Sequence, residues 1–328
     1  MKKNNKINLL YQMIRMRKVE EKIVSEYVNQ EMRCPVHLSI GQEAVSTAIC
    51  ANLSKSDQIV SAHRSHFHYL AKGGNLSKMI SELYGKDTGC ARGKGGSMHL
   101  IDINAGIIAA VPIVGSTIPI GVGLAWGNKL KNSKKIVVVF IGDGATEEGV
   151  FFESLNFASL HKLSVLFVCE NNLYSVYTPL YKRQAKNRNI IKIANSFGIE
   201  GSRMDGNDVE NIFYKTKKFI SKIKKTGNPI LLEFSTYRYL EHCGPNNDDN
   251  LNYRNNREIS FWKKNDAVFI LEKYLVKLDK TFNHKKFKDS FIKFVNRIFR
   301  KIYMNNKPNK INLKNFVYKK TWLNLRIV

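Results

Sequence analysis

Acidic residues and cysteines are both scarce in this chain of 328 residues. It has 27 Asp and Glu against 53 Lys and Arg, and it has five cysteines. The cysteines are scattered without a C-x-x-C pair, which argues against a zinc ribbon or a disulfide framework and indicates reduced thiols. We therefore expect a cytoplasmic protein. Because 43% of its residues are hydrophobic, the chain can still bury a large core.

Long apolar segments are also scarce. The N-terminus is basic and lacks an apolar run of signal-peptide length, so it is interpreted as mature sequence, and apolar residues at helical spacing predict an amphipathic helix over 13–27. Residues 105–127 carry no charge over 23 positions, enough to cross a bilayer. Pro112, Pro119 and five glycines argue against a transmembrane helix. We expect a buried loop and helix beside a ligand there, and no membrane association.

The excess of positive charge is concentrated at the C-terminus. Residues 280–328 hold 14 Lys and Arg and one acid, Asp289, so +13 of the net charge of +26 lies in them. We interpret residues 1–279 as one globular domain and residues 280–328 as a basic extension. The whole chain is rich in Lys, Asn and Ile, so this composition need not mark a nucleic-acid site, and no nucleic acid is expected as a partner. A phosphate-binding or acidic-partner surface is the alternative.

Two common phosphate-binding motifs are absent. No G-x-G-x-x-G lies between a strand-like and a helix-like run, which argues against a dinucleotide site. Residues 89–97, GCARGKGGS, resemble a P-loop, but three residues separate Gly89 from Gly93 and Lys94 is followed by glycine. Their glycines and basic residues still suggest a loop that closes over an anionic ligand.

Residues 135–175 have the pattern of a β-α-β unit. KIVVVFI (135–141) and LSVLFVC (163–169) are apolar and rich in β-branched residues, as expected of strands buried on both faces of a parallel sheet. Apolar residues at helical spacing lie between them, over 146–162. The crossover makes the strands parallel, so Asp143 and Asn172, which follow them, are expected at the same edge of the sheet.

The residues at these two strand ends suit a metal and an anion together. Carboxylate and amide oxygens are hard ligands that suit Mg²⁺ or Ca²⁺ rather than Zn²⁺. A helix beginning just after Gly144 would offer free backbone N–H groups to an anion, and the flanking glycines would let it approach. A metal-bridged diphosphate satisfies both features. Taken singly, a turn Asp or a strand-end Asn is more often structural.

Six ordered motifs resemble one enzyme family. GDG, followed by 26 residues and then NN, resembles the thiamin-diphosphate motif. Together with it, five flanking segments resemble the alpha subunit of the thiamin-diphosphate-dependent first component of 2-oxo-acid dehydrogenase complexes: HLSIGQEA (37–44), AHRSH (62–66), GKGGSMH (93–99), IVGSTIPIGVG (113–123) and TYRYLEH (236–242). The resemblance runs from about residue 9 to 275. It implies a three-layer α/β fold with a mostly parallel central sheet, and thiamin diphosphate and Mg²⁺ as cofactors.

The resemblance also implies roles for single residues. The Mg²⁺ ligands would be Asp143, Asn172 and the backbone oxygen of Tyr174. The other cofactor contacts are implied at His63, Arg64, Val114, Gly144, Ala145 and His242. Of these, the Arg64 guanidinium suits a diphosphate because it can pair with phosphate oxygens bidentately.

Histidines form a second group of candidates. Without the resemblance, one interpretation would be a zinc cluster of His63, His66, His68 and His99; the matching positions argue against it. His37 and His63 match residues of the substrate pocket, and His63 stands where acetoin-type enzymes have His and mammalian pyruvate enzymes have Tyr. His66 is a weaker catalytic candidate, with a structural role as the alternative.

Residues 237–254 resemble the family's active-site loop. His242 matches its histidine, implicated in proton transfer and in passing the intermediate to the lipoyl carrier, and a neutral imidazole can donate and accept a proton in one turnover. Glu241 and Cys243 depart from the family's Gly and Ser, so regulation by phosphorylation is not expected at this position.

The resemblance implies oxidative decarboxylation of pyruvate with acyl transfer to lipoamide. It also implies two partners: a beta subunit, in an alpha2beta2 heterotetramer, and a lipoyl-bearing acyltransferase. Acetoin or a branched-chain 2-oxo acid is the alternative substrate, and a non-catalytic basic scaffold is the alternative of another class. No Glu of the motif segments falls where the family supplies the carboxylate that activates the cofactor, so activity is expected only with the beta subunit.

Overall fold

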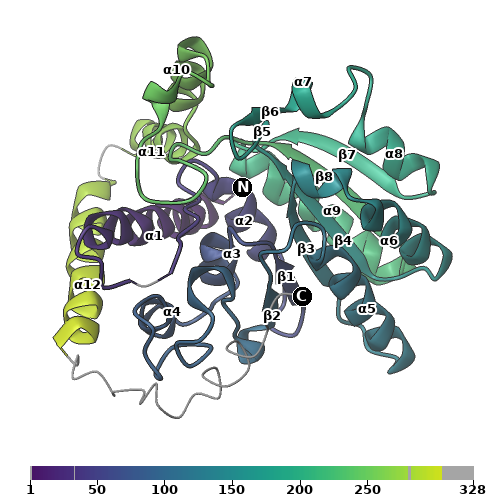
Figure 1. Ribbon diagram of the computed structural model, residues 1–328, viewed down its shortest axis with the longest axis horizontal. Coiled ribbons are helices and arrows are strands. Elements are labelled where there is room, and N and C mark those ends of the chain that lie inside the picture. Colours follow the sequence, from purple (N-terminus) through teal and green to yellow (C-terminus); the bar gives the residue numbers. More distant parts are fainter. Residues whose placement is uncertain (1, 33, 280–281, 305–328) are drawn as a thin grey trace, which may run out of the picture.

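Six parallel strands form the central sheet of the structure, a computed structural model that describes residues 2–32, 34–279 and 282–304 (Figure 1). The order across the sheet is β2 (Ile107–Ala110), β1 (Gln58–Ser61), β3 (Val137–Gly142), β4 (Val165–Asn171), β8 (Ile230–Ser235) and β7 (Glu200–Asp205). Every pairing is parallel. This sheet confirms the expected α/β class with a mostly parallel centre.

Strand residues alternate between two hydrophobic layers, as the pleat requires. Val138 and Phe140 of β3 pack into one layer, whereas Val137 and Val139 pack into the other. Helices cover both layers and make the fold three-layered. The first is covered by α2 (Glu43–Cys50), α3 (His66–Ala71), α4 (Leu76–Leu83) and α9 (Val209–Thr226), and the second by α5 (Thr117–Leu130), α6 (Gly149–Leu160) and α8 (Ile190–Ser196).

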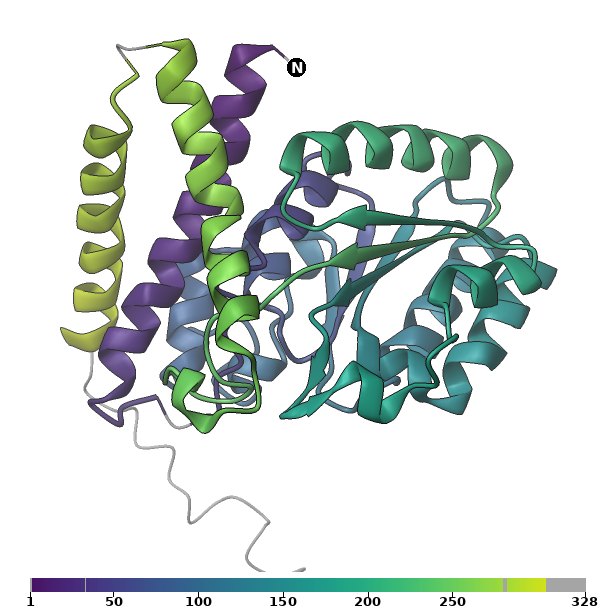
Figure 2. The same cartoon turned by 90° about the horizontal axis from the view of Figure 1, so that it is seen from above.

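Three long helices lie side by side at one end of the molecule (Figure 2). They are α1 (Lys3–Tyr27), α11 (Ala267–Leu278) and α12 (His284–Met304). In α1, Met13, Met16, Val19 and Ile23 of the predicted apolar face are fully buried and Tyr27 is half-buried, which confirms the amphipathic helix. In α12, Val295 and Phe299 are buried in the same core. This part of the basic extension is therefore packed against the rest of the chain, and the domain division at residue 279 stays a prediction.

The β-α-β prediction is confirmed, with one difference at the helix start. β3 and β4 pair in parallel, with Gly142 opposite Glu170. The turn Asp143–Glu147 is a 3₁₀ helix, and α6 begins only at Gly149. The backbone N–H groups closest to Gly144 therefore belong to this tight turn and not to a long helix.

The uncharged segment 105–127 differs from expectation. It contains the edge strand β2, a loop over 111–116 and the first part of α5. The loop is exposed rather than buried: Ile113 is 70% and Val114 is 50% accessible. Pro119 lies in the first turn of α5, where no intrahelical N–H is required. Among the described residues no helix is long and apolar enough to cross a membrane.

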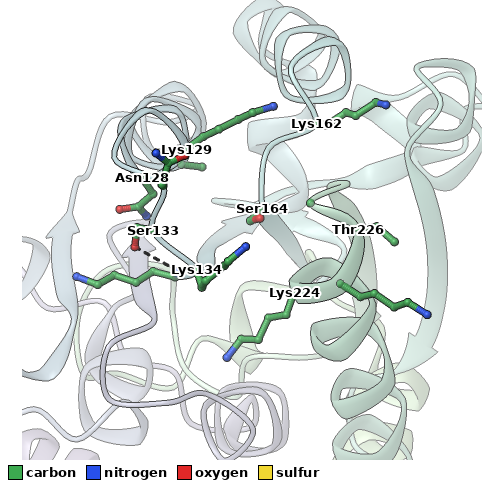
Figure 3. Close-up of a pocket in the computed structure, with 13 residues that line it drawn as sticks. Asn128, Lys129, Ser133, Lys134, Lys162, Ser164, Lys224 and Thr226 are labelled. Carbon is green, nitrogen blue, oxygen red and sulfur yellow. Dashed lines mark hydrogen bonds between the residues drawn. The ribbon is translucent and has the colours of Figure 1, made fainter.

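A lysine-lined cavity of about 330 Å³ lies at the amino ends of β3, β4 and β8 (Figure 3). Lys134 and Lys162 lie shortly before the first residues of β3 and β4, and Lys224 lies in the last turn of α9, the helix before β8. Lys224 pairs with Asp57 at 2.9 Å. The cavity lies at the amino ends of the strands, whereas the motif residues follow the carboxyl ends. It is therefore separate from the site described next.

Candidate active site at the carboxyl edge of the sheet

Four neighbouring strands, β1, β3, β4 and β8, end at one edge of the sheet, and the motif residues follow those ends. His63 and Arg64 come after β1, Asp143 after β3, Asn172 after β4 and His242 in the loop after β8. Ligands of open parallel sheets bind at this edge. The fold thus brings together residues that are far apart in the sequence.

Asp143 is a buried carboxylate, with 2% of its surface accessible. Arg183 forms an ion pair with it and reaches Glu147 through its other terminal nitrogen. Burial raises the pKa of Asp143 above its ordinary value, and the hydrogen bond from Arg183 opposes that rise. This carboxylate already pairs with a cationic side chain, so its surroundings can accommodate a positively charged group.

Asn172 and Tyr174 lie directly after β4. The Asn172 Oδ1 accepts a hydrogen bond from the backbone N–H of Tyr174 at 3.2 Å, which turns the chain into the short hairpin β5 (Tyr174–Ser175) and β6 (Thr178–Pro179). Gly144 faces this hairpin: a Cβ there would lie 3.3 Å from Ser175 Oγ. A glycine at 144 therefore leaves space where a phosphate could approach the backbone.

Arg64 is a buried cation without a carboxylate partner among the described residues. It is 9% accessible and donates to the backbone oxygens of Leu38 and His242, the latter at 3.1 Å. Burial, together with the positive charge of Arg238, lowers the pKa of Arg64 to about 10. A buried guanidinium is costly unless an anion neutralises it, so Arg64 suits a phosphate group.

His37, His63 and His242 form a three-histidine cluster next to Arg64. Their ring centroids are 4.7 Å (His37 to His63), 5.1 Å (His37 to His242) and 5.5 Å (His63 to His242) apart. Burial and the charge of Arg64 lower the pKa of His63 to about 4 and that of His242 to about 3. The imidazoles are therefore neutral near pH 7 and can accept a proton.

His66 does not join this cluster. It is fully buried, with Nδ1 3.1 Å from a carboxylate oxygen of Glu20 and Nε2 2.7 Å from the hydroxyl of Ser97. His68 is held in the same way between Ser61 and Glu170 and stacks on a phenylalanine of β3. Both rings have two partners, which favours a structural role for His66.

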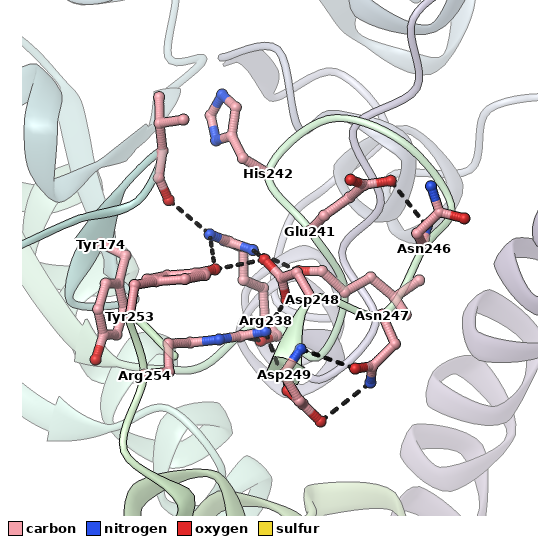
Figure 4. Close-up of polar contacts among 12 residues, drawn as sticks. Tyr174, Arg238, Glu241, His242, Asn246, Asn247, Asp248, Asp249, Tyr253 and Arg254 are labelled. Atoms are coloured by element: carbon pink, nitrogen blue, oxygen red, sulfur yellow. Dashed lines mark hydrogen bonds and ion pairs between the residues drawn. The ribbon is translucent and has the colours of Figure 1, made fainter. Parts of the chain in front are cut away.

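A buried ionic network shapes the loop that carries His242 (Figure 4). Asp248 accepts hydrogen bonds from Arg238, Arg254 and Tyr253, and both arginines are almost wholly buried. Arg238 also donates to the backbone oxygen of Val176 at 2.7 Å, which ties the loop to the tip of the β5–β6 hairpin. The histidine and the residues after β4 are therefore held in one connected structure.

The two remaining predicted cofactor contacts lie on separate elements. Ala145 is buried in the 3₁₀ turn after β3. Val114 is in the exposed loop before α5, next to Gly115, which adopts a φ of +85°. The sequence does not mark Arg183 as part of the site, because its partner Asp143 lies 40 positions away in the chain. The Asp248 network was also missed, although its partners lie within 10 positions of Asp248.

The fold and site define an α/β protein whose residues at the carboxyl ends of a parallel sheet have the chemistry to bind a cation and a phosphorylated ligand. A family model described as "Dehydrogenase E1 component" matches residues 11–309, beyond the limit of 275 suggested by the motifs. Pyruvate dehydrogenase E1 component subunit alpha of Rickettsia felis is 36% identical over 264 residues, which cover 80% of this chain and 80% of that protein. The alpha subunit of acetoin:2,6-dichlorophenolindophenol oxidoreductase of Bacillus subtilis is 36% identical over 270 residues, covering 82% and 80%.

The chain belongs to the dehydrogenase E1 component family. More particularly, it is an alpha subunit of a thiamin-diphosphate-dependent 2-oxo-acid dehydrogenase, an oxidoreductase that acts on an oxo group. The family implies thiamin diphosphate with a divalent metal ion, and a beta subunit as partner. The residues fit these groups, since a buried arginine that has no carboxylate partner in the described part of the chain and a buried carboxylate both lie at the carboxyl ends of the strands.

Proposed function

We propose that this chain acts with a beta subunit in the oxidative decarboxylation of pyruvate and the transfer of the acyl group to a lipoyl-bearing acyltransferase. The observation that carries the proposal is Arg64, a buried guanidinium that lacks a carboxylate partner among the described residues. Its charge calls for a bound anion, and the diphosphate of the family's cofactor supplies one. Five free cysteines fit a reducing compartment, so we place this activity in the cytoplasm.

In this proposal the residues divide into three groups by chemistry. Asp143, Asn172 and the backbone oxygen of Tyr174 hold Mg²⁺, since all three are oxygen donors. Arg64 and the backbone at Gly144 and Ala145 would bind the diphosphate. Val114 meets the aminopyrimidine ring through its backbone. When bound, thiamin diphosphate would supply the nucleophilic carbon and the electron sink that decarboxylation of a 2-oxo acid requires.

The three-histidine cluster has the chemistry for the substrate side. His37 and His63 line the pocket, and His242 holds or moves a proton. Burial and the charge of Arg64 lower the pKa of His242 to about 3, so its imidazole is neutral at pH 7. It accepts a proton only from a strong acid or when a negative charge forms beside it.

The exposed apolar residues before and along α5 suit the beta subunit. Ile113, Val114 and Ile120 are each at least 39% accessible, which is unusual for aliphatic side chains that follow one another closely. Burial against a partner would remove them from water. In an alpha2beta2 heterotetramer, this surface would contact the beta subunit. The beta subunit would also supply the carboxylate that activates the cofactor, which the motif segments of this chain lack.

Acetoin is the second candidate substrate, favoured by His63 and by the acetoin oxidoreductase relative. The test is a substrate panel with the purified two-chain enzyme, Mg²⁺, thiamin diphosphate and a dye acceptor. Pyruvate should give the highest kcat/KM, ahead of acetoin and branched-chain 2-oxo acids, and the alpha chain alone should be inactive. Higher kcat/KM for acetoin would transfer the proposal to that substrate, and turnover by the alpha chain alone would refute the need for the beta subunit.

A further inference from the structure

The lysine-lined cavity at the amino ends of β3, β4 and β8 has no part in the proposed function. The 13 residues that line it in the described part of the chain include no Asp or Glu (Figure 3). We propose that this cavity is a binding site for a sugar phosphate that carries two phosphate groups. The phosphates contact lysines of the lining, of which there are six: Lys129, Lys134, Lys135, Lys162, Lys224 and Lys225.

Three turns at one edge of the sheet form the cavity. Lys134 comes from the turn between α5 and β3, Lys162 from the turn between α6 and β4, and Lys225 from the last turn of α9, which leads into β8. These strands are parallel neighbours, so their first residues lie side by side. Each turn also has a residue with a positive φ, at Asn132 (52°), Lys162 (46°) and Gly227 (74°), which reverses the chain sharply after the helix. The fold thus gathers lysines from distant parts of the sequence around one space.

Lysines at helix C-termini have an ordinary explanation, and it accounts for only part of this charge. The helices α5, α6 and α9 all end beside the cavity, and each helix C-terminus carries a partial charge of about −0.5. Lys129 donates to the backbone oxygen of His161, at the end of α6, at 2.6 Å, and Lys224 pairs with Asp57 at 2.9 Å. Six lysines against three helix ends and one carboxylate leave an excess of about +3.5. This excess attracts an anion of high charge.

Most of the lining lysines lack a partner of opposite charge. Lys222, which is on α9 but does not line the cavity, pairs with Glu200 at 2.5 Å. Four lysines of the lining form no ion pair with any described residue: Lys134, Lys135, Lys162 and Lys225. A single exposed ion pair contributes little, so an anion binds here only if several lysines reach it at once. Two phosphate groups, each with a charge of about −1.5 to −2 at pH 7, meet this requirement because they can contact neighbouring turns.

The size and lining of the cavity favour a sugar over a nucleotide. Its volume of about 330 Å³ is at the lower end of the range for small-molecule sites, about 300–1,000 Å³. Within the described ranges no aromatic residue lines it, so a nucleotide base would have no ring to stack on. Asn132 and Ser164 line the cavity, and their side chains form no hydrogen bond with another described residue. They are therefore available to the hydroxyl groups of a sugar.

The cavity is independent of the active site. Asp143 follows the last residue of β3, whereas Lys134 precedes its first residue, and the six residues of this strand span about 20 Å. A ligand in the cavity therefore does not compete with thiamin diphosphate. Its binding is measured without substrate, so this proposal and the proposed function can fail separately.

The experiment is a calorimetric titration of fructose 1,6-bisphosphate into the two-chain enzyme, saturated with Mg²⁺ and thiamin diphosphate so that the active site is occupied. We expect one saturable site per alpha chain, with an affinity that falls as the salt concentration rises. Lys134→Gln and Lys162→Gln change exposed side chains on two different turns. Each should weaken binding by about fivefold, and the double variant by about 25-fold. Lys131→Gln is the control, an exposed lysine in the same turn as Lys134 that does not line the cavity, and it should bind as the wild type does.

Two further ligands test the chemical class. Fructose 6-phosphate has one phosphate, and ADP has two phosphates and a base; both should bind at least about five times more weakly than the bisphosphate. Three results would overturn the proposal. One is the absence of saturable binding of the bisphosphate. Another is an equal loss of affinity in Lys134→Gln and Lys131→Gln, which would mean that the basic surface as a whole attracts the anion. The third is binding of ADP as tight as that of the bisphosphate, which would remove the sugar from the assignment.

Discussion

Arg183 forms an ion pair with Asp143, the carboxylate that follows β3, and both side chains are nearly buried. Arg183 comes from α7 (Leu180–Arg183), which follows the β5–β6 hairpin. Its guanidinium lies on the carboxylate that we propose as a Mg²⁺ ligand. A divalent ion on Asp143 would repel Arg183 unless the diphosphate lies near both cations, so metal and diphosphate should bind together.

The first prediction concerns this carboxylate. Asp143→Ala should weaken Mg²⁺-dependent binding of thiamin diphosphate to the two-chain enzyme by about 3 kcal/mol or more, which is over 100-fold. Arg183 keeps Glu147 as a partner, so the fold should survive. Calorimetric titration measures the affinity. Asp205→Ala is the matched control, an exposed carboxylate at the same sheet edge. Wild-type affinity in Asp143→Ala would remove Asp143 from the metal site.

The second prediction separates two histidines that were both candidates for catalysis. His242→Ala should lower kcat by about 10²–10⁴ with little change in stability, because it removes a group that moves protons. His66→Ala should destabilise the chain by about 2–4 kcal/mol, because it removes the imidazole that bonds to one oxygen of the buried Glu20 and to the Ser97 hydroxyl. Denaturant unfolding and steady-state kinetics of both variants decide the matter. The opposite pattern would make His66 the catalytic residue.

The third prediction concerns the network beneath the active-site loop. Asp248→Ala leaves Arg238 buried without a carboxylate partner and leaves Arg254 with only its contact to Asp249 at 3.2 Å, and it should destabilise the chain by about 3–5 kcal/mol. Proteolysis within residues 241–254 should become faster. Asp249→Ala is the comparison, since this neighbouring, more accessible acid pairs with Lys263 at 2.7 Å and with Arg254 at the longer distance of 3.2 Å, and it should matter by less than about 1 kcal/mol. Equal stability of the two variants would show that the buried network does not hold the loop.

The fourth prediction concerns α12. Removing residues 282–328 takes Val295, Phe299 and Ile302 out of the core and should lower stability by an amount on the order of 5 kcal/mol. A chain that ends at residue 304 keeps every described contact of this helix and is the control. Thermal unfolding of the two truncated chains compares them. If the shorter chain were as stable and soluble as the longer one, residues 280–328 would be an appended surface, as the domain prediction holds.

The fifth prediction concerns pH. Burial alone would raise the pKa of Asp57, but hydrogen bonds from Lys224 and Ser54 outweigh it, so the pKa lies below its ordinary value. A carboxyl group with a lowered folded-state pKa stabilises the fold above its unfolded pKa of about 3.9, and this stabilisation disappears as pH falls through the folded pKa. Asp57→Asn should therefore lose about 1.5–3 kcal/mol at pH 7. Its difference from wild type should shrink below about pH 4.

Urea unfolding at several pH values measures this difference. Glu200→Gln is the control, because Glu200 and Lys222 form an exposed pair at 2.5 Å with little expected effect. A gap between Asp57→Asn and wild type that stayed constant from pH 7 to pH 3 would show that the charge of Asp57 is not what stabilises the start of β1.

The sequence by itself determined the local elements and the chemistry of the strand ends. Runs of β-branched residues defined β3 and β4. The residues that follow these runs, Asp143 and Asn172, predicted a site for a cation and a diphosphate. Both the runs and the residues after them are local patterns that can be read from neighbouring positions. The edge strand β2 was missed. It lies inside an uncharged, glycine-rich segment where a strand and a buried loop have the same composition.

Only the tertiary structure decided which distant residues meet. His37, His63 and His242 come together because β1 lies beside β3 and because the loop after β8 folds back to pair Gly244 with His37. Arg183 reaches Asp143 from the segment after the hairpin, and α12 packs on α1 from the other end of the chain. The order of the strands and the path of the loop after β8 back to His37 depend on long-range packing of the whole core, and no local pattern of residues encodes them.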